Sequence, residues 1–326
     1  MKLIVPMAGK NSKLNPYTSS TPKPLIHVAG KPLLGHLLDK LNVLKISEAI
    51  FIVDEDNEEL KQYISSNYKF KSRFILQKER KGVAHAIFGA KKLIHDGEVM
   101  ILFADTLIDT NLDLIKKTKA DGIIWTKQVK DPRQYGVVFM YGGMITQLIE
   151  KPDTPISDKA IVGLYYIRDV EKLFSSIDFL IKNKIMTKGE YQLTDAFQLM
   201  INRGARLISG DVKVWQDCGT IPNLLETNKY LLSKVKNSSG DFKNTVIIKP
   251  VFIEKGAKIT NSVIGPNVSI GKNTKVNSCI VTDSIISENV YLENAVLKEC
   301  TIGKDAKVQG TGKKLNMGES SELFSP

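Results

Sequence analysis

The chain opens with the apolar run Leu3-Ile4-Val5, which is followed by the small-residue stretch Ala8-Gly9-Lys10-Asn11-Ser12-Lys13-Leu14. An apolar run before a glycine-containing turn is typical of the first strand of a parallel α/β sheet, and the N–H groups of such a turn can hold phosphate oxygens. Lys13, and Lys23 in Thr21-Pro22-Lys23-Pro24-Leu25, add positive charge on both sides. A generic α/β turn lacks this rigid basic segment. The stretch therefore predicts a nucleoside triphosphate site that includes Ala8, Gly9 and Lys13.

Short apolar runs alternate with amphipathic stretches up to about Leu232. The predicted strands include Ala49–Val53, Phe74–Leu76, Val99–Phe103 and Gly122–Trp125, and the predicted helices include Pro32–Leu44, Asn57–Tyr68 and Gly82–Ile94. This alternation predicts an α/β domain with a Rossmann-like, mostly parallel sheet and helices on both faces. Ligands of such sheets bind at the carboxyl ends of the strands.

The period changes after a predicted closing helix, Pro222–Lys236, and the polar stretch Asn237–Asp241. From there, aliphatic residues recur every five or six positions: Ile253, Ile259, Ile264, Ile270, Val276, Val281, Ile286, Leu292, Leu297, Ile302 and Val308. This internal repeat predicts a parallel β-helix, with a meandering β-domain as the alternative. We expect a catalytic domain at 1–236, a linker at 237–250, the β-helix at 251–309 and a flexible tail at 310–326, where no period continues.

The composition, 42% hydrophobic and 25% charged, is typical of a globular protein, and no apolar run approaches the roughly 20 residues of a membrane span. The N-terminus does not resemble a signal peptide. Cys218, Cys279 and Cys300 match no metal spacing and favour a reducing compartment, so we expect a cytoplasmic protein. The net charge of +11 is spread along the chain, and aromatic residues are only 7%, which favours small polyanions over nucleic acid as partners.

Acidic residues mark a candidate metal site. Asp105 follows the predicted strand Val99–Phe103, and a carboxylate at the carboxyl end of a strand suits Mg²⁺, which prefers oxygen ligands. The alternative for Asp105 is a cap of the next turn. Asp217, in Trp215-Gln216-Asp217-Cys218-Gly219-Thr220, is the second candidate. Gln77 offers both a donor and an acceptor for the edge of a pyrimidine base, and Gly82 allows a close backbone approach.

These motifs, in this order over residues 1–309, resemble the sugar-phosphate nucleotidylyltransferase family, with a C-terminal β-helix like the left-handed hexapeptide type. The resemblance is carried by Lys13-Leu14-x-Pro16, Pro22-Lys23-Pro24-Leu25 and Val28-Ala29-Gly30-Lys31-Pro32. Asn11 replaces the second glycine of the family loop, Lys13 replaces an arginine and Ala104 replaces a glycine. Asparagine tolerates a positive φ, whereas lysine keeps the charge of arginine without its two-pronged geometry.

The resemblance implies a role for each candidate residue. Asp105 and Asp217 would bind Mg²⁺, Gln77 and Gly82 would meet the base, and Lys13 and Lys23 would act in catalysis. The sugar phosphate would be bound by three runs, namely Tyr135-Gly136, Glu150-Lys151 and the run around Gly163. The stretch Glu190–Asp195 also matches the family and predicts a helix start.

The implied reaction joins glucose 1-phosphate to the nucleotide of dTTP and releases pyrophosphate, with UTP as the alternative donor. The attacking phosphate has a second pKa of about 6 and needs no general base, so lysines, carboxylates and a metal suffice. A non-catalytic nucleotide-sugar-binding regulatory protein is the alternative of another class, because of Asn11 and Lys13. No histidine follows His95, so we do not expect the β-helix to acetylate by a histidine base. We expect it to join copies in a homo-oligomer or to support the catalytic domain.

Overall fold

The structure is a computed structural model, and it describes residues 1–8, 14, 22–235, 242–310 and 315–324. The chain forms two compact units, the first from Met1–Gly9 and Leu38–Trp215, the second from Lys10–Leu37 and Gln216–Pro326. Helix α1 (Leu33–Lys40) and strand β13 (Val214–Asp217) run from one unit into the other. This division differs from the expected domain boundary at residue 236. Residues 22–37, which follow the opening loop, pack with the β-helix rather than with the sheet.

The first unit is built on a nine-stranded sheet with the order β10-β9-β11-β6-β1-β4-β5, in which β8 pairs with β11 and β12. Strands β6, β1, β4 and β5 are parallel, whereas β11 is antiparallel to β6, β8 and β9. The predicted α/β class is confirmed. The sheet is mixed because β11 runs in the opposite direction to the strands with which it pairs. The strands are β1 (Lys2–Pro6), β4 (Glu48–Val53), β5 (Lys71–Leu76), β6 (Val99–Leu102), β8 (Gly122–Gln128), β9 (Gly136–Tyr141), β10 (Met144–Glu150), β11 (Lys159–Ile167) and β12 (Leu207–Asp211).

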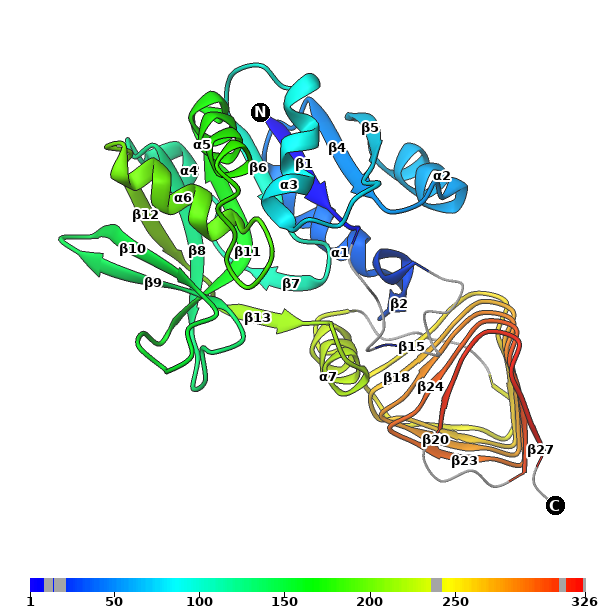
Figure 1. Ribbon diagram of the computed structural model, residues 1–326. Helices are drawn as coiled ribbons and strands as arrows, with labels where there is room; N and C mark the ends of the chain where they lie inside the picture. Colours follow the sequence, from blue (N-terminus) through cyan, green and yellow to red (C-terminus); the bar gives the residue numbers. More distant parts are fainter. Residues whose placement is uncertain (9–13, 15–21, 236–241, 311–314, 325–326) are drawn as a thin grey trace. The chain divides into compact units, whose positions relative to one another are not determined.

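Helices α3 (Val83–Phe88), α5 (Val170–Lys182) and α6 (Leu193–Asn202) contact one another over one face of this sheet (Figure 1). Their apolar side chains form one cluster with alternate residues of the strands, among them Ile4 and Ile101. Helix α2 (Glu58–Asn67) begins one residue after the predicted start, because Asn57 caps it: Oδ1 of Asn57 accepts a 2.8 Å hydrogen bond from the N–H of Leu60. Helix α4 (Leu114–Lys117) also belongs to the first unit. None of the described helices is both long and apolar enough to cross a membrane.

The second unit contains the β-helix, whose strands stack in three parallel sheets around a triangular coil (Figure 1). All eleven predicted aliphatic positions belong to its interior cluster, and each is at most 9% exposed. The predicted β-helix is confirmed. Its strands are β14 (Val246–Ile247), β15 (Val251–Ile253), β16 (Lys258–Thr260), β17 (Val263–Ile264), β18 (Val268–Ile270), β19 (Lys275–Asn277), β20 (Ile280–Thr282), β21 (Ile285–Ile286), β22 (Tyr291–Glu293), β23 (Val296–Lys298), β24 (Thr301–Ile302), β25 (Lys307–Gln309), β26 (Asn316–Met317) and β27 (Glu322–Phe324).

The polar residues of the repeat form the corners of the coil. Asn273, Asn289 and Asp305 have positive φ angles of 58°, 57° and 57°, a conformation that asparagine and aspartate tolerate better than most residues. They also stack, because Nδ2 of Asn273 donates to Oδ1 of Asn289 at 3.3 Å and Nδ2 of Asn289 donates to Oδ1 of Asp305 at 2.9 Å. The sequence repeat thus reflects corner geometry as well as core packing.

The β-helix extends beyond its expected bounds at both ends. Strand β14 lies in the expected linker 237–250 and pairs with β17, while β26 and β27 lie in the expected flexible tail 310–326 and pair with β24 and β25. Met317 and Leu323 pack against the interior cluster, so apolar burial continues although the spacing of the repeat changes. Both expectations are therefore corrected. Residues 236–241, 311–314 and 325–326 lie outside the described residues.

The second unit also contains α7 (Ile221–Leu232) and a hairpin of β2 (His27–Val28) and β3 (Lys31–Pro32). Helix α7 contacts β2 of this hairpin and β18 of the β-helix.

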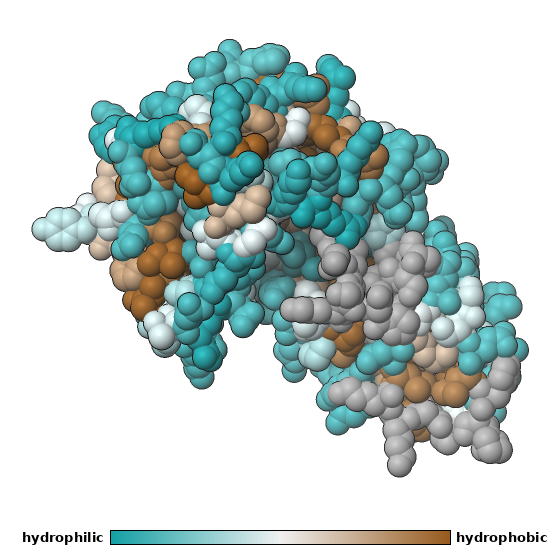
Figure 2. Space-filling view, viewed as in Figure 1, coloured by the Kyte–Doolittle hydropathy of each residue, from teal (hydrophilic) through white to brown (hydrophobic). Residues whose placement is uncertain are grey.

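The surface of the protein is largely polar. Figure 2 shows hydrophilic residues over most of the visible face, as expected for a chain in which 25% of residues are charged.

Candidate active site

Asp105 lies in the turn between β6 and β7 (Thr106–Asp109), at the carboxyl end of the buried strand β6. Gly163 of β11 positions this turn. Its φ is +83°, and a Cβ there would lie 2.9 Å from the ring of Phe103, while its carbonyl oxygen accepts a 2.9 Å hydrogen bond from the N–H of Phe103. Only glycine allows β11 to approach so closely. The structure therefore gives Gly163 a role in holding the backbone just before Asp105.

Asp105 and Glu150 act on the same buried phenol. The side chain of Tyr165 is 4% exposed, and its pKa is raised first by burial and then by the negative charges of Glu150 and Asp105. Tyr165 belongs to β11, which pairs with β6, the strand before Asp105, and also with β9. Strand β9 in turn pairs with β10, which ends at Glu150.

Strands β9 and β10 pair so that Gly136 lies opposite Glu150. The hydroxyl of Thr194 donates a 2.6 Å hydrogen bond to Oε2 of Glu150, and Nζ of Lys151 lies 3.8 Å from Oε1. A Cβ on Gly136 would lie 2.9 Å from Oε2, so glycine is needed for this approach. The Glu150 side chain is 11% exposed, and its burial raises the carboxyl pKa, although Thr194 and Lys151 oppose the shift.

Two further carboxylates lie near Glu150. Asp195 and Glu190 both add to the rise in the Glu150 pKa, and burial raises the pKa of Asp195 itself. Helix α6 begins at Leu193, which confirms the predicted helix start. The sequence analysis assigned Thr194 and Asp195 to the start of this helix and gave them no role in the site. The resemblance of the stretch Glu190–Asp195 to the family was the one sequence feature that pointed to such a role.

An aromatic pair links the turn that contains Tyr135 to β7, the strand after Asp105. The rings of Tyr135 and Trp215 are 4.7 Å apart at 68°, and Nε1 of Trp215 donates a 2.6 Å hydrogen bond to Oγ1 of Thr106. The N–H of Lys151 donates to the carbonyl oxygen of Tyr135 at 3.1 Å. Trp215 belongs to the motif that carries Asp217 but was not a candidate site residue, and in the structure its ring packs against that of Tyr135.

Gln77 and Gly82 lie on either side of the loop between β5 and α3. Nε2 of Gln77 donates to the carbonyl oxygen of Glu79 at 3.1 Å. Gly82 has φ +106°, and a Cβ there would lie 2.5 Å from the carbonyl oxygen of Tyr191. The close approach that Gly82 allows in this structure is therefore to the protein's own backbone.

The remaining predicted residues include members of the second unit. Lys23 lies in the 3₁₀ helix η2 (Lys23–Leu25) and is 9% exposed. Oδ1 of Asp217 accepts a 2.8 Å hydrogen bond from the N–H of Gly219, and Thr220 then caps α7. Ala8 follows β1 and is half-buried, whereas Gly9 and Lys13 lie outside the described residues.

Among the described residues, no group of three or more His, Cys, Asp or Glu side chains is arranged to hold a metal ion. Two carboxylates, those of Asp105 and Asp217, nevertheless have the donor chemistry that Mg²⁺ prefers, and this ion is commonly completed by phosphate oxygens and water. Each of these carboxylates can therefore supply oxygen donors of the kind that suit this ion, Asp105 from the first unit and Asp217 from the second.

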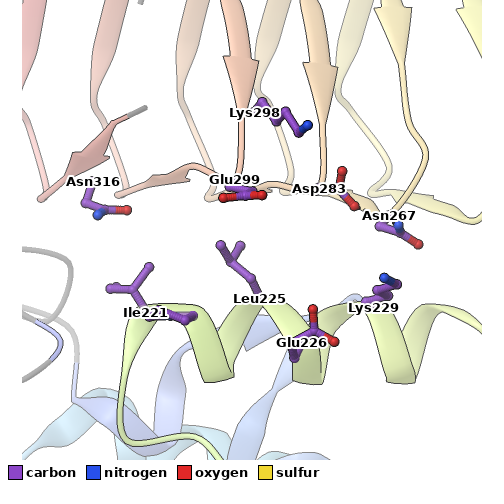
Figure 3. A pocket seen from close by; sticks show the side chains of 10 residues that line it. Ile221, Leu225, Glu226, Lys229, Asn267, Asp283, Lys298, Glu299 and Asn316 are labelled. Atoms are coloured by element: carbon purple, nitrogen blue, oxygen red, sulfur yellow. Dashed lines mark hydrogen bonds between the residues drawn. The ribbon is translucent and has the colours of Figure 1, made fainter. Parts of the chain in front are cut away.

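A cavity of about 430 Å³ lies within the second unit, between α7 and the turns of the β-helix (Figure 3). None of the predicted site residues that the structure describes lines this cavity.

Comparison with known proteins decides the family. The family model for nucleotidyl transferases matches residues 2–234. The chain belongs to this family. A second model, described as a GlmU-like C-terminal hexapeptide domain, matches residues 227–292 and agrees with the left-handed hexapeptide type predicted for the β-helix. The family resemblance found in the motifs is thereby confirmed.

Two curated relatives of this nucleotidyl transferase are informative. The bifunctional protein GlmU of Methanocaldococcus jannaschii is 34% identical over 264 residues, which cover 79% of this chain and 61% of that protein. The chain thus spans less than two thirds of the length of that relative. The glucose-1-phosphate thymidylyltransferase of Streptomyces antibioticus is 28% identical and covers 100% of this chain and 95% of its own length.

The fold is also shared with a solved structure of UDP-glucose pyrophosphorylase complexed with UDP-glucose, with a TM-score of 0.62 and 23% identity. The match covers 72% of this chain and 99% of that one. At this identity the likeness shows the fold alone.

Proposed function

We propose that the protein transfers a nucleoside monophosphate from a pyrimidine nucleoside triphosphate to a sugar 1-phosphate, with dTTP and glucose 1-phosphate as the preferred pair. The observation that carries this proposal is the Glu150 carboxylate, which Thr194 and the backbone of Gly136 hold in one orientation, within a nucleotidyl transferase. A relative named glucose-1-phosphate thymidylyltransferase, which matches along the whole chain, supports the choice of substrates.

In this reaction a phosphate oxygen of the sugar 1-phosphate forms a bond to the α-phosphorus, and the bond from that phosphorus to pyrophosphate breaks. The attacking oxygen is already ionised near neutral pH, so the protein has to position the two substrates and neutralise their charges. Lys13 and Lys23 would neutralise the triphosphate, and Lys151 the phosphate of the sugar. Glu150 would accept hydrogen bonds from sugar hydroxyls, held in one orientation by Thr194.

Asp105 and Asp217 would hold Mg²⁺, which when bound offsets negative charge on the phosphates. Gln77 would bind the edge of the base through its side-chain amide, with Gly82 shaping the turn beside it. Tyr135 and Gly136 would border the sugar, since Gly136 lies against Glu150 and Tyr135 is fixed by Trp215. No described residue separates ribose from deoxyribose, so UTP is the competing donor in the test below.

We also propose that the protein works as a homo-oligomer in the cytoplasm. The hexapeptide β-helix supports self-association, and three buried cysteine thiols, Cys218, Cys279 and Cys300, are suited to a reducing compartment.

The test is pyrophosphate release by the purified protein with magnesium, across the common nucleoside triphosphates and sugar 1-phosphates. The highest kcat/KM with dTTP and glucose 1-phosphate is the expected result, and a preference for UTP would reassign the donor. If no pair gives pyrophosphate while nucleotide sugars still bind, the protein is a regulatory binding protein instead.

A further inference from the structure

One face of the β-helix is an internal packing surface of the second unit. On the sheet that contains β18 and β21, the outward-facing residues, which alternate with the interior positions, are also buried. Ser269 is 5% exposed and Ile285 is 1% exposed. On the neighbouring sheet, the equivalent Ile280 is 46% exposed. Helix α7 covers the buried face, and Figure 3 shows its Ile221 and Leu225 side chains pointing toward the β-helix turns.

The side chain of Asn228, on α7, joins three segments of the second unit and is 1% exposed. Its Oδ1 accepts hydrogen bonds from the N–H of Ala29 at 2.9 Å and from the hydroxyl of Ser269 at 2.6 Å. Its Nδ2 donates to the carbonyl oxygen of Asn267 at 3.3 Å. An amide oxygen has two lone pairs, and these two hydrogen bonds use both of them. Removing this side chain would leave the N–H of Ala29 buried without its acceptor.

The next residue of the hairpin is fixed to the β-helix by a different contact. Gly30 has φ +89°, and a Cβ there would lie 2.3 Å from Cζ of Phe252 in β15. The ring of Phe252 therefore lies directly against the backbone of Gly30. Ala29 and Gly30 are thus held by two independent contacts, one polar and one apolar.

Lys23 is connected to this hairpin by a short hydrogen-bonded segment. The N–H of Ile26 donates to the carbonyl oxygen of Lys23 at 3.2 Å, and the N–H of Leu33 donates to the carbonyl oxygen of Ile26 at 2.9 Å. Pro24 restricts the backbone further. A shift of the hairpin away from the β-helix would therefore move Lys23 as well.

We propose that Asn228 is a positioning residue, which holds the Lys23 segment on the β-helix through Ala29. This inference rests on the proposed function, in which Lys23 contacts the triphosphate. The β-helix would then be a support for the nucleotide side of the reaction. Asn228 acts through Ala29 and Lys23, and a displacement of about 1 Å at a reacting group can cost about a hundredfold in rate.

A double-mutant cycle tests this proposal. Asn228→Ala should lower kcat/KM for the nucleoside triphosphate about tenfold or more in the natural background, and less than about twofold when Lys23 is already alanine. Equal losses in both backgrounds would show a general structural effect and overturn the proposal. Lys229→Ala changes the adjacent, exposed residue of α7 and should leave kcat/KM unchanged.

Hydrogen exchange gives a readout that does not depend on turnover. In Asn228→Ala the amide of Ala29 should exchange about tenfold faster while the amides of β18 are unchanged. Unchanged exchange at Ala29 would contradict the proposal. Phe252→Ala should have the same effect through the second contact, and it replaces Asn228→Ala if that variant does not fold.

Failure of the proposed function would be distinguishable from failure of this inference. If the natural protein releases no pyrophosphate with any substrate pair, the same cycle is measured as the Kd for each nucleoside triphosphate. Coupling between Asn228 and Lys23 in Kd, with faster exchange at Ala29, would support the positioning role without turnover. Additive effects on Kd would overturn it.

Discussion

The hydroxyl of Thr194 donates a 2.6 Å hydrogen bond to Oε2 of Glu150, and the backbone of Gly136 lies against that same oxygen. A residue near the start of α6 and a residue opposite in the sheet thus fix one carboxylate between them. The orientation of Glu150 is set by the protein's own residues, and this relationship leads directly to two testable predictions.

The first prediction concerns pH. Burial raises the pKa of Glu150 above the ordinary value of 4.5, so the protonated form is the better tolerated form in the folded protein. The stability that this group contributes is present below pH 4.5 and is lost as the pH rises through the raised pKa. The glutamine of the Glu150→Gln variant does not ionise. The unfolding free energy of this variant relative to the natural protein should therefore increase as the pH rises from 4.5 through the raised pKa of Glu150. Thermal unfolding from about pH 4 to about pH 8 measures this, and a difference that does not change with pH would contradict it.

The second prediction concerns the space beside Glu150. In Gly136→Ala the new Cβ would lie 2.9 Å from Oε2 of Glu150, so the carboxylate has to move. The KM for the sugar 1-phosphate should rise about tenfold, with little change in the KM for the nucleotide. Gly89→Ala is the matched control, because its Cβ would meet only Ile75, at an ordinary 3.7 Å. Equal KM values in the two variants would remove Gly136 from the sugar site.

The third prediction concerns the metal. Asp105→Asn should abolish magnesium-dependent pyrophosphate release, a loss of about a hundredfold or more, because an amide holds Mg²⁺ more weakly than a carboxylate. The melting temperature should stay close to that of the natural protein, since Asp105 is exposed. Asp113→Asn removes another exposed carboxylate, outside the candidate site, and should keep full activity. Near-normal turnover of Asp105→Asn would exclude Asp105 from catalysis.

The fourth prediction concerns the end of the β-helix. A chain that ends at Gly310 lacks β26 and β27 and uncovers Ile302 and Val308, both 0% exposed in the full chain. Its β-helix should lose about 2 kcal/mol or more of unfolding free energy, measured by chemical denaturation. A chain that ends at Phe324 serves as the control. If the two chains are equally stable, the last strands contribute nothing to the fold.

Much of the fold follows from local patterns. The regular spacing of residues such as Ile264 and Ile302 predicted the β-helix because each coil buries one aliphatic side chain per face. The same reasoning failed at β26 and β27, where residues 310–314 interrupt the spacing and only pairing with β24 and β25 continues the coil. The contact of Thr194 with Glu150 could not be predicted from a local pattern either, since the two residues are 44 positions apart in the sequence.

The amino-acid sequence by itself determined the α/β class and the repeat, and it supplied the residues that we propose to bind phosphates, sugars and magnesium. It did so because side-chain periodicity and donor chemistry are local properties of a chain. Only the tertiary structure decided that the segment carrying Lys23 packs with the β-helix, through the contact of Ala29 with Asn228, which is 199 residues away. The physical reason is that such a contact depends on which buried surfaces meet after folding, and no local pattern specifies that.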